Sequence, residues 1–95
     1  MSAPNLQRGT PRARFERDML RWIQDRLAPP GAHVGEATPL FARGLIDSIR
    51  ILELIAWTER AIGRRIPDVQ IRLDNFHSVE RIARTFLPEA DDAAA

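Results

Sequence analysis

The first apolar pattern along the chain predicts one amphipathic helix between Pro11 and Leu27. Thr10 and Pro11 are a typical helix start, an N-cap residue followed by proline at the first helical position. Apolar residues then recur at helical spacing, at positions 15, 19, 22, 23 and 27. Pro29-Pro30-Gly31 ends the helix, because proline lacks the backbone donor and disfavours helical geometry in the residue before it.

The most apolar helix is predicted from Ile49 to Ile62, directly after Asp47-Ser48 and before Gly63. One face should pack on the first helix, and it comprises Ile51, Leu54, Ile55, Thr58 and Ile62. A second apolar strip runs along the flank next to Ser48, and it comprises Ile49, Leu52 and Ala56. This strip is a candidate docking face, although it could equally pack under a loop.

The last helix is predicted to begin after Ser78 and to end before Pro88. Its Val79, Ile82, Ala83 and Phe86 keep the i, i+3, i+4, i+7 spacing. Residues 71–76 are too short and irregular for more than a helical turn or two. The long connection over 28–46 needs anchors in the core, and we expect these to be Leu40, Phe41 and Leu45.

Together these elements predict an all-α fold, an up-and-down bundle of three main helices and one short helix with a long loop after the first. No segment alternates with the period of a strand. We expect a disordered N-terminal segment at 1–9, one domain at 10–88 and a flexible acidic and alanine-rich tail at 89–95. A core this small leaves little room for a catalytic cavity, so we do not expect an enzyme.

Charge and composition exclude several classes of function. The 14 basic residues are all arginine and oppose 13 acidic ones, a near balance that argues against an electrostatic nucleic-acid binder. There is no cysteine, and His33 and His77 are far apart in sequence, so we predict no metal site. No stretch reaches the roughly 20 apolar residues of a membrane span, and no secretory signal is visible, so we expect a cytoplasmic protein.

Ser48 is the candidate chemical site. It stands at the start of an apolar helix directly after an acid, where an exposed hydroxyl, free backbone N–H groups and the positive dipole end would favour a phosphodiester. The simpler interpretation is that Asp47 or Ser48 caps the helix, as such residues do in many soluble proteins.

Several spaced motifs distinguish this site from an ordinary cap. They are Leu40-Phe41-Ala42-Arg43-Gly44-Leu45-Ile46-Asp47-Ser48-Ile49, then Leu52-Glu53-Leu54-Ile55 and Thr58-Glu59, then Ile62-Gly63-Arg64-Arg65-Ile66-Pro67-Asp68, and finally Asn75-Phe76-His77-Ser78-Val79-Glu80-Arg81-Ile82. In this order the motifs resemble the acyl and peptidyl carrier protein family of phosphopantetheine-binding domains, over roughly residues 13–87.

The resemblance implies that a phosphopantetheinyl transferase attaches 4'-phosphopantetheine from coenzyme A to Ser48. The thiol of that arm would then carry an acyl or aminoacyl group as a thioester. Asp47 matches the family's acid before the serine, which helps present the serine to the transferase and its magnesium ion. Ile49, Leu52, Glu53 and Ala56 would form the partner-binding face, and the domain itself would catalyse nothing.

Two departures point to a stand-alone carrier of a specialised pathway. Carriers of fatty-acid synthesis usually have a strongly acidic second helix, but here Arg50 and Arg60 accompany Glu53 and Glu59. The Leu-Ile-Asp-Ser sequence also looks closer to stand-alone carriers served by adenylate-forming ligases. We therefore expect a monomer that meets such a ligase and a downstream acyl-accepting enzyme, with fatty acyl, aminoacyl and polyketide cargoes all open.

Two other hypotheses remain at this point. The chain could be an unmodified helical interaction module that keeps the carrier fold, or an arginine-rich nucleic-acid binder whose binding is sensitive to salt and independent of Ser48. The Asp47-Ser48 pair favours the carrier over both. We expect neither nucleic acid nor membrane as a partner.

Overall fold

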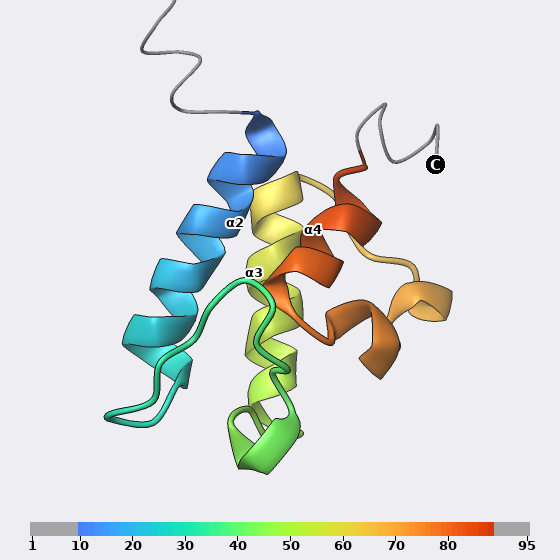
Figure 1. Ribbon diagram of the computed structural model, residues 1–95. Helices are drawn as coiled ribbons and strands as arrows, with labels where there is room; N and C mark the ends of the chain where they lie inside the picture. Colours follow the sequence, from blue (N-terminus) through green and yellow to red (C-terminus); the bar gives the residue numbers. More distant parts are fainter. Residues whose placement is uncertain (1–9, 89–95) are drawn as a thin grey trace, which may run out of the picture.

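The computed structural model describes residues 10–88, and this part of the chain is helical without strands (Figure 1). It contains the α-helices α2 (Pro11–Trp22), α3 (Arg50–Ile62) and α4 (Val79–Phe86), together with the short helical turns η1 (Ile23–Leu27), η2 (Ala42–Gly44), η3 (Asp68–Gln70) and η4 (Leu73–Phe76). The prediction of an all-helical fold is confirmed for these residues, and the arrangement is compatible with a small helical bundle. The expectations for 1–9 and 89–95 lie outside the described residues.

Helix α2 begins at the predicted cap. The Thr10 Oγ1 accepts a hydrogen bond from the Ala13 amide at 3.1 Å, and Pro11 is the first helical residue. The helix continues into the π-helical turn η1 and ends at Ala28, whose backbone is extended as expected before a proline. Its buried side chains are Phe15, Met19, Ile23 and Leu27.

The connection from 28 to 46 is anchored in the core, but not only where the sequence pattern predicted. Leu40 is fully buried as expected, whereas Phe41 and Leu45 are half-buried against the core. Two buried anchors were missed, Val34 and Ile46. They stand among polar residues, glycines and prolines without helical periodicity, so the pattern gave no signal for them.

Helices α3 and α4 use the predicted faces. In α3, Leu54 and Thr58 are fully buried, and the remaining members of that face are half-buried against the core, namely Ile51, Ile55 and Ile62. In α4 the whole predicted face is buried, namely Val79, Ile82, Ala83 and Phe86. The Ser78 hydroxyl caps α4 by accepting a hydrogen bond from the Arg81 amide at 3.1 Å.

The order of the helices places both ends of the connection at one end of the bundle. In Figure 1, α2 and α3 run in opposite directions, so the end of η1 and the start of α3 lie at the same end, together with η2. Contacts between α2 and α3 include the tilted Phe15–Trp57 pair and the stacked Trp22–Trp57 pair, with ring centroids 5.7 and 5.4 Å apart. The segment between η2 and α3, which contains Ser48, therefore lies at the same end of the bundle as the end of η1.

Candidate functional site

A backbone turn delivers the chain to the start of α3. Gly44 has a φ of +72°, a left-handed conformation that most other residues avoid. After this turn the Ile46 amide donates to the Leu40 carbonyl at 2.9 Å, and the Ile46 side chain is buried. With Ile46 fixed inward, the three following residues, Asp47, Ser48 and Ile49, are all exposed.

Asp47 is the physical cap of α3. Its Oδ1 accepts hydrogen bonds from the Ile49 amide at 3.2 Å and the Arg50 amide at 2.9 Å. Its carbonyl accepts from the Ile51 amide at 3.2 Å, so the first helical turn begins directly after it. Two backbone N–H groups that the sequence analysis expected to be free are thus already taken by this carboxylate.

Ser48 is the first residue after this cap and is exposed. Because Asp47 takes the cap, the Ser48 hydroxyl is not needed for it, and no partner of that hydroxyl is found in the part of the chain that the structure describes. Within residues 10–88, the Asp47 side chain accepts hydrogen bonds through Oδ1 alone, and Oδ2 has no hydrogen-bond donor. An exposed serine oxygen beside a carboxylate oxygen fits the covalent attachment of a phosphate-linked group.

Arg50 ties this site to the first helix. Its Nη1 donates to the Leu27 carbonyl, the last residue of η1, at 2.8 Å. This hydrogen bond joins residues 23 positions apart and fixes the first turn of α3 against the end of η1. Sequence reasoning treated Arg50 only as a surface charge, because no local pattern shows which distant carbonyl an arginine will reach.

The expected partner face is exposed along the first turns of α3. Ile49 and Leu52 are 73% and 66% exposed, and Glu53 is also exposed. Ala56, one turn further, is half-buried. The structure therefore brings Ile49, Leu52 and Glu53 together on the solvent side, and Ala56 lies at the edge of that surface.

A second group of exposed apolar residues was missed by sequence reasoning. Val69, Ile71 and Leu73 of the η3 and η4 stretch are exposed, with Val69 at 80% and Leu73 at 63%. The residue that follows η4, His77, accepts a hydrogen bond at its carbonyl from the Leu40 amide at 2.8 Å. Since Leu40 also bonds Ile46, backbone contacts link the end of η4 to the turn before Ser48.

No protein-family model matches the chain, and no curated protein sequence is significantly similar to it. The proposal of a function therefore rests on the motifs and on the geometry around Ser48.

Three further findings concern metal binding, membrane spans and the two histidines. In the described range 10–88, no group of three or more His, Asp or Glu side chains is placed to hold a metal ion. None of the described helices is long and apolar enough to cross a membrane. The two histidines, His33 and His77, are both exposed.

Proposed function

We propose that the chain is a stand-alone carrier protein whose Ser48 bears a phosphopantetheine arm and that this arm carries an acyl or aminoacyl group as a thioester. The observation that carries the proposal is the exposed Ser48 hydroxyl directly after Asp47. The Asp47 carboxylate caps α3, so the Ser48 hydroxyl does not cap it. The motif order around it supports the same conclusion. In this proposal α2, α3, α4 and the η3–η4 stretch are the four helices of a carrier-like bundle.

The attachment step requires little from this chain beyond presentation of a nucleophile. The Ser48 oxygen attacks the phosphorus of coenzyme A that carries the pantetheine, a new P–O bond forms, and adenosine 3',5'-bisphosphate leaves. The serine proton passes to a base of the transferase. Asp47 holds the first turn of α3 in shape through Oδ1, while Oδ2 can meet the transferase's magnesium ion.

The surface beside Ser48 supports a selective partner. Ile49 and Leu52 offer apolar contact area, while Asp47, Arg50 and Glu53 place both signs of charge around it. An enzyme selected for an acidic carrier would meet Arg50 with mismatched charge, which removes steering and adds repulsion. We therefore assign the carrier to a specialised pathway, with an adenylate-forming ligase as its loading enzyme and a downstream acyl-accepting enzyme.

The proposed working form is a cytoplasmic monomer without catalytic activity of its own. The same exposed face would also serve an unmodified interaction module. The two functions differ in one property, the need for a modified Ser48.

The test is the intact mass of the full chain after incubation with coenzyme A and a broad-specificity phosphopantetheinyl transferase. Wild type should gain one phosphopantetheine and Ser48→Ala should gain none. A Ser78→Ala variant is the matched control, since Ser78 is the buried N-cap residue of α4 and its hydroxyl is not the proposed attachment point. An unmodified wild type, with a second carrier modified in the same tube, would favour the interaction module.

A further inference from the structure

The connection between η1 and α3 forms an open groove with a volume of about 590 Å³. We name it the connection groove, and its lining comprises Pro29, Ala32, His33, Thr38, Pro39, Ala42 and Leu45. Most of these side chains are apolar, with the Thr38 hydroxyl and the His33 ring as the polar groups. The volume falls within the range of about 300–1,000 Å³ that is usual for small-ligand pockets.

Both limbs of the connection are held by hydrogen bonds, so the groove is preformed. On the first limb, the Gln24 side chain of η1 accepts from the Val34 amide at 3.0 Å and donates to the Ala32 carbonyl at 2.5 Å. On the second limb, the Thr38 Oγ1 accepts from the Gly35 amide at 2.8 Å. That bond uses a lone pair of Thr38, which leaves its O–H to donate to a ligand.

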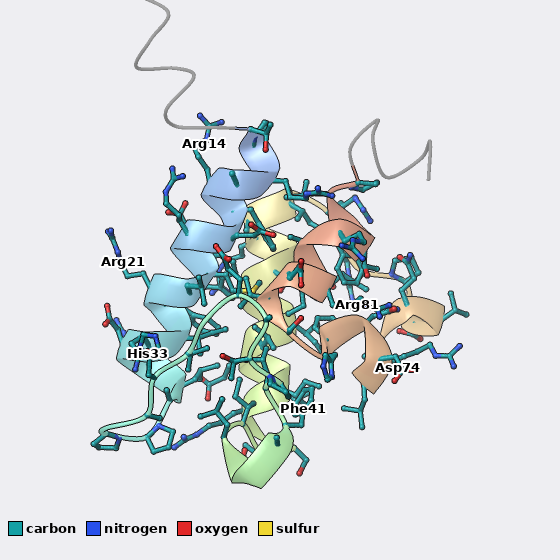
Figure 2. The ribbon with its side chains drawn as sticks, in the orientation of Figure 1. Arg14, Arg21, His33, Phe41, Asp74 and Arg81 are labelled. Carbon is teal, nitrogen blue, oxygen red and sulfur yellow. The ribbon has the colours of Figure 1, made fainter. Side chains whose placement is uncertain are left out.

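The groove lies next to Ser48. Leu45 lines it and precedes Ser48 by three residues, a separation that the backbone can extend to at most about 11 Å. From the other side, the Arg50–Leu27 hydrogen bond joins the first turn of α3 to the residue two places before Pro29. Figure 2 shows His33 on the limb that leaves η1, well apart from Phe41 on the second limb.

We propose that the connection groove binds the acyl end of the arm attached to Ser48 when the carried group is a linear hydrocarbon chain. This inference rests on the proposed function. The apolar lining fits a hydrocarbon chain, and the Thr38 hydroxyl can donate to a carbonyl of the arm or of the thioester. A charged aminoacyl group would lose hydration in this lining, so it would stay outside.

The test uses the absence of cysteine from the chain. Ser48→Cys creates a unique thiol, which can be alkylated with two pantetheine-like haloacetamides that end in an acetyl or a hexanoyl group. We expect the amide NMR shifts of Ala32, Ala42 and Leu45 to change with the hexanoyl arm and to change little with the acetyl arm. Because attachment is chemical, this result does not depend on the transferase.

A pair of matched variants then shows where the hexanoyl chain binds. Ala42→Phe fills the groove and should abolish the difference between the two arms, whereas Ala61→Phe, on an exposed position near the far end of α3, should preserve it. Equal NMR shifts for the acetyl and hexanoyl arms would overturn the inference. It would also be overturned if the two arms differed in their shifts at Ile51 and Leu73 and not at the groove residues. Neither outcome would affect the modification of wild-type Ser48, so the two proposals fail separately.

Discussion

Helix α4 and the first turns of α3 are both amphipathic, but they differ in how far their apolar residues are buried. Every apolar residue of the predicted α4 face is buried, and Phe86 contacts Phe76 of η4 with ring centroids 5.5 Å apart. In α3 the apolar strip beside Ser48 is exposed, at 73% for Ile49 and 66% for Leu52. One apolar helix face thus builds the core, and the other is left for solvent or for a partner.

The difference arises from what packs on each helix. Helix α4 is covered by α2 and by η4, so its apolar side chains leave water on folding. The start of α3 already buries its inner face through Leu54, and Arg50 and Asp47 hold its first turn from the flanks. Ile49 and Leu52 therefore add little to folding, and their exposure fits the docking face of the proposed function.

The comparison predicts its largest effect in α4. Phe86→Ala removes a 98% buried ring that contacts Phe76, and we expect it to lower the free energy of unfolding by about 3–5 kcal/mol. Urea unfolding followed by circular dichroism measures this loss. A change below about 1 kcal/mol would mean that the core is not centred on this face.

The next effect separates the two roles of Asp47. Asp47→Ala removes the cap and should lower the free energy of unfolding by about 0.5–2 kcal/mol. Asp47→Asn keeps an oxygen that caps equally well, so its stability should match wild type while its rate of modification by the transferase falls. If Asp47→Asn is modified as fast as wild type, the carboxylate acts only as a cap.

The smallest effect on stability is predicted at the exposed strip. Leu52→Ala should change the free energy of unfolding by less than about 0.5 kcal/mol, because the side chain is largely in water. The KM of a docking enzyme should nevertheless rise about tenfold, the loss expected when one buried leucine contact is removed from an interface. Arg60→Ala, also exposed but further along α3, is the control and should leave that KM unchanged.

Sequence periodicity was sufficient for the helices and insufficient for the parts between them. The buried face of α4 follows from spacing alone, and the caps Thr10 and Ser78 follow from residue type. Val34 and Ile46 were missed as core anchors because a loop has no period that marks its inward side. The Arg50–Leu27 bond and the groove depend on the path of the connection, which local patterns do not encode.

The position of the candidate site could be predicted from sequence, but the separate roles of Asp47 and Ser48 could not. The motif marks Asp47 and Ser48 together, and either could have capped the helix. Only the geometry assigns the cap to Asp47 and leaves the Ser48 hydroxyl exposed.

The central claim is tested most directly by locating the modification in the wild-type chain. Trypsin cleaves after Arg43 and Arg50, which releases residues 44–50, a peptide whose single hydroxyl side chain is that of Ser48. After reaction with coenzyme A and the transferase, we predict one phosphopantetheine on this peptide and none on any other. An unmodified 44–50 peptide, in a reaction where a known carrier is fully converted, would contradict the account.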